Sequence, residues 1–115
     1  MQIVKDKISI QALQEMSEKM YGNFVKAVVD IDQEIMMVDA EMHADLEEML
    51  LEEGSEQKNL WGINLHPKKT VEPWIEFDSM INVRPSQDNR SRYVENSKIR
   101  DKIIEVVTKL VQRQS

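Results

Sequence analysis

The spacing of apolar residues changes from helical to strand-like and back along this chain, and this change constrains the fold more than any other feature. Leu13, Met16 and Met20 recur at i, i+3 and i+7, which is typical of one apolar helix face. From residue 24 onward the period is two, and apolar side chains share one side of the segment: Val25, Ala27, Val29 and Ile31. Two such periods in one short chain predict an α+β protein.

Helical spacing and capping residues predict three helices. The first runs from Ile10 to about Tyr21, with Ser9 as its N-cap and Gly22 just beyond its end. The second begins with a capping-box-like sequence at Asp45 and stops at Gly54.

The third helix is capped by Asn96 or Ser97 and carries a broad apolar face as far as Val111. Period-two alternation predicts four strands, and short connections favour pairing them as two hairpins. The predicted strands are Phe24–Ile31, Glu34–His43, Leu60–Leu65 and Trp74–Arg84.

The predicted order is therefore α-β-β-α-β-β-α. Each helix has one apolar stripe and each strand one apolar face, so the economical arrangement is a two-layer sandwich. We expect a four-stranded, mainly antiparallel sheet with three helices on one face, in a single domain over residues 1–115.

In this arrangement the sheet face without helices collects polar side chains. Candidates for acid–base chemistry are Glu41, His43, Glu76 and Asp78. Candidates for ligand binding are Asn64, Asn82, Arg84, Asn89, Arg90 and Arg92. Trp74 is expected on the same face, as a platform or an oligomer contact, whereas Trp61 points to the core.

Three arginines, Arg84, Arg90 and Arg92, lie within nine residues of a chain whose net charge is -6. Arginine is preferred where a carboxylate or phosphate is held by a forked pair of hydrogen bonds. Eleven acidic residues and no Lys or Arg occupy residues 30–56. These acids form a solvated surface, or some of them meet the late arginines in space.

His43 allows two kinds of chemistry. On one strand, Glu41 and His43 would share a face and could ligate a divalent metal together with Asp30 or Asp78. They could instead form a carboxylate–imidazole pair for general base catalysis. A lone histidine near a helix start is also compatible with a purely structural role, and the residues do not identify a metal.

Several classes of function are disfavoured. The chain has no cysteine, which removes thiolate chemistry and suits a reducing cytoplasm. It lacks a glycine-rich phosphate loop, an apolar run long enough for a bilayer and a signal-peptide core, so we expect mature sequence and no membrane partner. Its net acidity makes duplex DNA an unlikely partner.

Four segments resemble a family of short microbial proteins classed as a domain of unknown function. They are K-A-V-V-D-I (26–31), E-M-H-A-D (41–45), L-W-G-I-N-L (60–65) and W-I-E-F-D-S-M-I-N-V-R-P-S-Q-D-N-R-S-R (74–92). The resemblance implies one domain of this length and no particular activity. It also implies a glycine pair before E-M-H, where this chain has Asp39 and Ala40.

Three hypotheses for the polar face remain open. It binds an anionic small molecule or a nucleic-acid end, with metal-assisted phosphoester hydrolysis as the reaction to test first. Alternatively it is a non-enzymatic interface for a homodimer or another partner, since aromatic residues and arginine are enriched at interfaces. In the third hypothesis the arginines fasten their own loop to the sheet.

Overall fold

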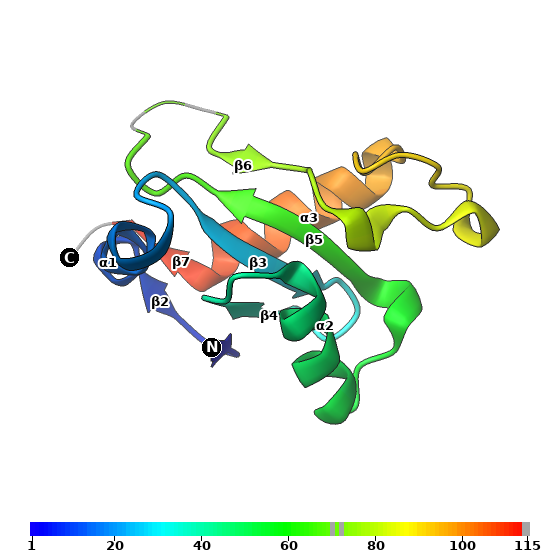
Figure 1. The fold of residues 1–115 in the computed structure, drawn as a ribbon, viewed down its shortest axis with the longest axis horizontal. Coiled ribbons are helices and arrows are strands. Elements are labelled where there is room, and N and C mark those ends of the chain that lie inside the picture. The colour runs from blue at the N-terminus through cyan, green and yellow to red at the C-terminus, as the bar shows by residue number, and fades with distance from the viewer. Residues whose placement is uncertain (70, 72, 114–115) are drawn as a thin grey trace.

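The protein is described by a computed structural model that covers residues 1–69, 71 and 73–113 (Figure 1). Its three α-helices are α1 (Ile10–Met20), α2 (His43–Glu52) and α3 (Ser97–Leu110). Its strands are β1 (Gln2–Val4), β2 (Ile8–Ser9), β3 (Val25–Asp30), β4 (Ile35–Val38), β5 (Leu60–Leu65), β6 (Ile75–Glu76) and β7 (Val111–Gln112). Short 3₁₀ turns, η1 (Gln57–Asn59), η2 (Met80–Asn82) and η3 (Pro85–Gln87), lie between them.

The main sheet has the strand order β1-β4-β3-β5-β6, and every neighbouring pair in it is antiparallel. The predicted α+β class, with three helices and a mainly antiparallel sheet, is confirmed. The sheet has five strands instead of four because the N-terminal residues Gln2–Val4 pair with β4. A separate parallel pair, β2 and β7, joins the two ends of the chain.

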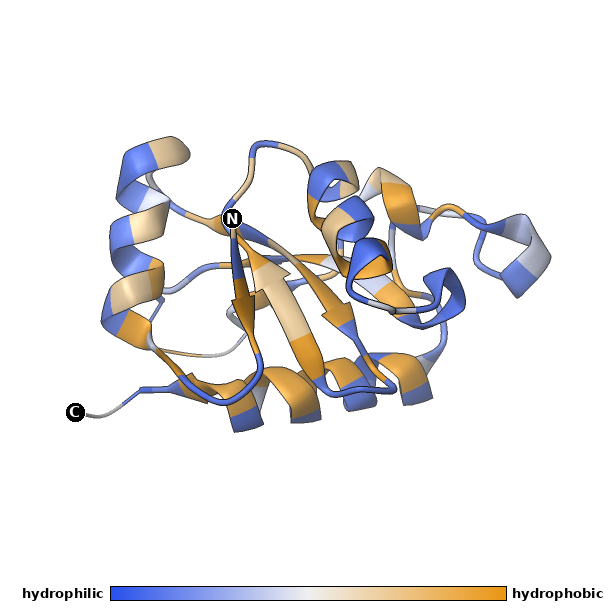
Figure 2. Cartoon of the chain, turned by 90° about the horizontal axis from the view of Figure 1, so that it is seen from below, coloured by the Kyte–Doolittle hydropathy of each residue, from blue (hydrophilic) through white to orange (hydrophobic). Residues whose placement is uncertain are grey.

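The helices cover both faces of the sheet, which corrects the prediction that all three lie on one face. Leu13 of α1 and Ile103 of α3 pack in one core with Ala27 and Val29. Leu46 of α2 packs in a second core on the opposite face, with the following residues: Val28, Ile35, Met37, Ala40, Leu50 and Leu60. Figure 2 shows α3, the helix that leads to the C-terminus, turning its apolar residues toward the sheet.

Two of the three predicted helix starts are confirmed. Ser9 Oγ accepts the N–H of Ala12 at the start of α1, and Asn96 Oδ1 accepts two N–H groups at the start of α3. Helix α2 begins at His43, so the capping role predicted for Asp45 is wrong. Among the described residues, none of the helices has the length and apolar character needed to span a bilayer.

The strand predicted for Glu34–His43 ends at Val38. Asp39 has a φ of +75°, in the left-handed region that favours glycine, and this turns the chain away from the sheet. Its N–H still donates to the carbonyl of Lys26 at 3.2 Å. Asp39 thus takes a glycine-like conformation at one position of the implied glycine pair, and Glu41 and His43 do not share a strand face.

The strand predicted for Trp74–Arg84 pairs only at Ile75–Glu76. Beyond β6, Ser79 Oγ caps the turn η2. The side chain of Asn82 then makes hydrogen bonds to the backbone of β5 in place of a paired strand. Its Oδ1 accepts the N–H of Gly62 at 2.8 Å and its Nδ2 donates to the carbonyl of Gly62 at 2.9 Å. We call residues 79–95 the edge segment, because they cover the part of β5 that β6 leaves unpaired.

Both tryptophans lie in the core. Trp61 is buried as predicted, and the guanidinium of Arg84 stacks over its ring at 4.9 Å. Trp74 is also buried, with Arg113 over its ring at 4.4 Å, so its predicted place on the polar face is wrong. The alternation starting at Trp74 assigned its side chain to the wrong face, because the paired strand begins only at Ile75.

Candidate functional site

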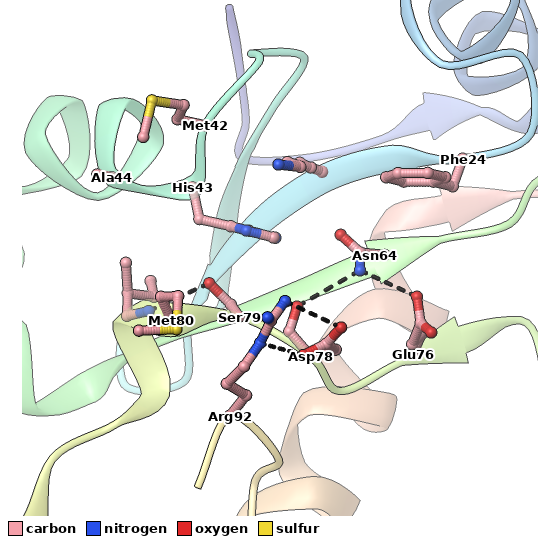
Figure 3. A pocket seen from close by; sticks show the side chains of 12 residues that line it. Phe24, Met42, His43, Ala44, Asn64, Glu76, Asp78, Ser79, Met80 and Arg92 are labelled. Carbon is pink, nitrogen blue, oxygen red and sulfur yellow. Dashed lines mark hydrogen bonds and ion pairs between the residues drawn. The ribbon is translucent and has the colours of Figure 1, made fainter.

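A pocket of about 340 Å³ opens on the sheet face that α2 covers only in part. Its wall brings together five of the predicted site residues: His43, Asn64, Glu76, Asp78 and Arg92. Figure 3 shows these side chains converging from α2, from β5 and β6, and from the segment that follows β6. Such a volume suits a small molecule.

The floor of the pocket is a row of three polar residues on neighbouring strands. Lys26 of β3 is the register partner of Asn64 in β5, and Asn64 is the partner of Glu76 in β6. Directly opposed residues in antiparallel strands have their side chains on the same face. The row therefore places a cation, an amide and a carboxylate side by side across the sheet.

Asn64 is held in one orientation. Its Nδ2 donates to Glu76 Oε1 at 2.9 Å and lies 3.4 Å from the carbonyl of Asp78 (Figure 3). Because both partners are acceptors, the amide nitrogen must face them and Oδ1 must face the other way. Asn64 is only 6% exposed, and its Oδ1 is shut off from solvent with no hydrogen-bond partner among the described residues.

The carboxyl of Glu76 is also held in its charged form. The hydrogen bond from the Asn64 amide lowers its pKa from the ordinary value, burial opposes this shift, and His66 at 3.3 Å assists it. A buried or half-buried carboxylate beside an amide donor is stabilised as an anion. The pocket thus keeps a negative charge at one end of the row.

His43 is the first residue of α2 and is buried. Its Nε2 lies 2.7 Å from the carbonyl of Ile63, so Nε2 carries the proton and donates it. Burial lowers the pKa of the ring, against the opposing effect of that hydrogen bond. The ring is therefore neutral at pH 7, and its Nδ1 carries an acceptor lone pair.

Arg92 and Asp78 form an ion pair at the rim of the pocket. Arg92 Nε lies 2.7 Å from Asp78 Oδ1, and Nη2 lies 3.2 Å from Oδ2. Both side chains are about half exposed, so this pair contributes little to stability. Its forked geometry positions a guanidinium beside the pocket without consuming all of its donors.

Arg84 lies outside this pocket and is committed to the backbone. Its guanidinium donates to the carbonyls of Ile81 and Gln57, each at 2.9 Å, and to that of Leu60. It also lies 3.4 Å from a Glu47 oxygen, so one acid of the 30–56 segment does meet a late arginine. Burial lowers the pKa of Arg84, and Glu47 opposes this shift.

Asn82 and Asn89 are likewise committed to the backbone of the edge segment. Besides pairing with Gly62, Asn82 Nδ2 donates to the carbonyl of Arg92 at 3.0 Å. Asn89 Nδ2 lies within 3.0 Å of three carbonyl oxygens, and its Oδ1 accepts the N–H of Glu95 at 2.8 Å. The contacts of Arg84, Asn82 and Asn89 fit the hypothesis that this stretch fastens its own loop to the sheet.

Two other predicted site residues lie away from the pocket wall. Glu41 is exposed in the turn before α2, where its backbone carbonyl accepts the hydroxyl of Tyr21. Arg90 is exposed in the edge segment, and its backbone N–H donates to Glu95. Neither residue lines the wall that contains His43 and Asn64.

The predicted metal ligands do not come together. Over residues 1–69, 71 and 73–113, no three His, Cys, Asp or Glu side chains are placed to hold one metal ion. Asp30 is buried and accepts hydrogen bonds from two backbone N–H groups, from Gln33 and from Ser55. Its carboxylate closes the β3–β4 turn and is not available as a ligand.

Sequence reasoning did not include the apolar side of the pocket. Met42 and Met80 are 59% and 66% exposed and stand on the same side of it (Figure 3). Phe24, whose ring stacks on that of Tyr21 at 4.7 Å, lines it elsewhere. Phe24 and Lys26 fall on the polar side of the predicted alternation, which is the signal that places them at the site.

Comparison with known proteins gives one match. Residues 2–110 match the family model described as a protein of unknown function, DUF5674. No curated protein and no solved structure matches this chain. The match spans nearly the whole sequence and agrees with the resemblance noted in the four segments above, so the chain belongs to the DUF5674 family.

Proposed function

We propose that this protein binds a small polar ligand carrying an anionic group in the pocket above the Lys26–Asn64–Glu76 row. The observation that carries the proposal is the buried Oδ1 of Asn64, which has no partner among the described residues and cannot be satisfied by rotating the amide. A buried acceptor without a hydrogen bond costs about 1–3 kcal/mol, and a ligand donor would remove that cost. Because Oδ1 is shut off from solvent, a small movement of the side chains around it must accompany binding.

The positive charge for the anionic group comes from Lys26 and Arg92. No carboxylate pairs with Lys26 among the described residues, and its ammonium lies 5.2 Å from the centre of the Tyr21 ring. Arg92 is paired with Asp78 but remains half exposed. We do not propose metal-assisted hydrolysis, because the described residues supply no ligand set. The cysteine-free composition is consistent with a cytoplasmic setting.

A thermal-denaturation screen tests this function. Carboxylates, phosphates, sugar phosphates and nucleotides are added singly, because a compound that binds only the folded state raises its melting temperature. A stabilising compound should lose its effect with Lys26→Met and keep it with Lys98→Met, which removes an exposed lysine of α3. If no anionic compound stabilises the wild-type protein at millimolar concentration, the proposal is wrong.

The exposed methionines favour a second candidate, an interface on the same face. Met42 and Met80 place flexible apolar surface beside the pocket, and methionine is common at adaptable binding surfaces. In this case the protein would self-associate, and Met80→Lys would dissociate the oligomer seen by light scattering. A wild-type protein that stays monomeric at high micromolar concentration would remove this candidate.

A further inference from the structure

The acceptor atoms at one end of the pocket indicate a second chemical group of the ligand, in addition to its anionic group. Three of them belong to residues that line the same cavity: Asn64 Oδ1, His43 Nδ1 and the carboxylate of Glu76. In Figure 3 the oxygen of Asn64 is turned toward the side from which the His43 ring enters. A carboxylate or a fully ionised phosphate has no donor for these atoms and would be repelled by Glu76.

The protonation of each atom is fixed by its other partner. Glu76 Oε1 accepts a hydrogen bond from Asn64 Nδ2, which leaves Oδ1 of Asn64 as an acceptor without a partner among the described residues. Nε2 of His43 donates to the carbonyl of Ile63, which leaves Nδ1 with a lone pair. Glu76 keeps a second oxygen, and its side chain is 52% exposed. All three groups therefore call for hydrogen-bond donors.

We propose that this end of the pocket binds a primary ammonium group, and that the ligand is a small zwitterion whose anionic group lies beside Lys26. The inference rests on the proposed function and adds the amino group to it. An ammonium carries three N–H donors, one for each of the three acceptors. Its positive charge is complementary to the negative charge of the Glu76 carboxylate. In this arrangement Lys26 binds the anionic end of the ligand, and Glu76 binds its cationic end. The amide of Asn64 lies between them.

The geometry of the row explains why its own charges do not cancel. Lys26 and Glu76 lie on strands on either side of β5, with Asn64 between them. No ion pair between them is present in the described part of the chain, where Glu76 contacts Asn64 and His66 instead. A zwitterion of matching length would neutralise both Lys26 and Glu76, whereas a simple anion would neutralise Lys26 only.

Paired probes test the amino group. The standard amino acids, β-alanine, γ-aminobutyrate and phosphoethanolamine are each compared with the analogue that lacks the amino group, such as propionate, butyrate or ethyl phosphate. We expect at least one zwitterion to raise the melting temperature and to bind at least tenfold more tightly than its deaminated analogue in calorimetry. Comparing the zwitterions that carry a carboxylate with phosphoethanolamine shows which anionic group the pocket prefers.

Two outcomes overturn the inference and are distinguishable from a failure of the proposed function. If deaminated anions bind as tightly as their amino counterparts, the ammonium site is wrong and the anion site stands. If neither kind binds while another anion in the broader screen does, the zwitterion is wrong. If nothing in either screen binds, both proposals fall, and Oδ1 of Asn64 is served by an ordered water alone.

Variants locate the amino group. Glu76→Gln keeps an acceptor for Asn64 and removes the charge, so it should weaken the zwitterion at least tenfold and its deaminated analogue less than twofold. Glu15→Gln, on the exposed side of α1, should change neither and serves as the control. Asn64→Leu should abolish the preference for the amino compound. If Lys26→Met destabilises the ligand-free protein as much as losing a buried hydrogen bond would, then Lys26 itself serves Asn64, and the ammonium site is wrong.

Discussion

Asn82 and Asn64 are both buried asparagines beside β5, and they differ in one respect. Asn82 is 0% exposed, and both of its side-chain polar atoms are bonded to backbone groups of Gly62 and Arg92. Asn64 is 6% exposed and has one atom bonded and one without a partner. The side chain of Asn82 thus has all its polar atoms hydrogen-bonded, and that of Asn64 does not.

This difference distinguishes polar residues that serve the fold from polar residues that still have an unused hydrogen-bonding atom. Buried polar groups are hydrogen-bonded in native proteins, and each exception needs an explanation such as a ligand or a water. Arg84 and Asn89 follow the rule, because backbone carbonyls accept their donors. The buried residues Asn82, Arg84 and Asn89 of the edge segment therefore stabilise the fold, whereas Arg92 of the same segment lines the candidate site.

The first prediction sets the two asparagines against each other in stability. Asn82→Ala leaves the N–H and carbonyl of Gly62 and the carbonyl of Arg92 without their partner, so we expect a loss of about 3–4 kcal/mol of unfolding free energy. Asn64→Ala removes the bond to the half-exposed Glu76 and the long contact to the carbonyl of Asp78, and should cost about 1 kcal/mol. Urea denaturation of both variants measures the difference. Equal losses would mean that the pocket is as structural as the edge segment.

The second prediction applies the same comparison to the arginines. Arg84→Lys should cost about 2–3 kcal/mol, because one ammonium cannot replace the forked contacts to Ile81, Gln57 and Leu60. Arg90→Lys should stay within about 0.5 kcal/mol, since Arg90 is exposed and only its backbone is bonded to Glu95. Thermal and urea denaturation provide both numbers. A large loss in Arg90→Lys would show a contact that the structure does not contain.

The third prediction concerns the close approach of the edge segment to β5. A Cβ at Gly62 would lie 2.5 Å from Ser79 Cβ and 2.6 Å from its Oγ. Gly62→Ala should therefore cost about 1–3 kcal/mol by overpacking. Ser79→Gly in the same chain should recover part of that loss, giving a coupling measurable in a double-mutant cycle. Simple additivity of the two changes would contradict the close contact.

The sequence predicted the fold well where a local signal was unambiguous. The strand Leu60–Leu65 and the cap Ser9 were predicted as they occur, and Asn96 is one of the two caps predicted for α3, because alternation and capping depend on neighbouring residues only. The side of the sheet chosen by α2 was missed. Its signal was present at Ile35 and Met37, which are apolar at positions assigned to the polar face.

Only part of the candidate site could be predicted from the sequence. Strand alternation placed Asn64 and Glu76 on one face, and the register confirms that they are neighbours. Alternation could not show that Asn82 leaves the strand and pairs through its side chain, because that depends on a contact with Gly62, twenty residues away. Nor could alternation distinguish the roles of Arg84 and Arg92. The two side chains differ in how deeply they are buried, which alternation does not show.

The last and smallest effect is electrostatic and compares one carboxylate from each region. The pKa of Glu95 is lowered by the Ser91 hydroxyl and the backbone N–H of Arg90, and that of Glu76 by the Asn64 amide. Both carboxyls should titrate below their ordinary value of 4.5 in NMR spectra of the folded protein. For a lowered pKa the unfolded chain binds protons first, so the stability from each group is complete above about pH 4.5 and is lost as the pH falls below it.

A bound zwitterion should separate the two groups. An ammonium beside Glu76 favours the charged carboxylate and should lower its pKa further, whereas Glu95, bonded within the edge segment, should titrate unchanged. The experiment follows both side-chain carboxyl carbons by NMR, with and without the tightest zwitterion from the paired screen. Its deaminated analogue is the matched control. A pKa of Glu76 that moves equally with both compounds would place the amino group elsewhere, whereas a shift at Glu95 would show that the edge segment itself responds to the ligand.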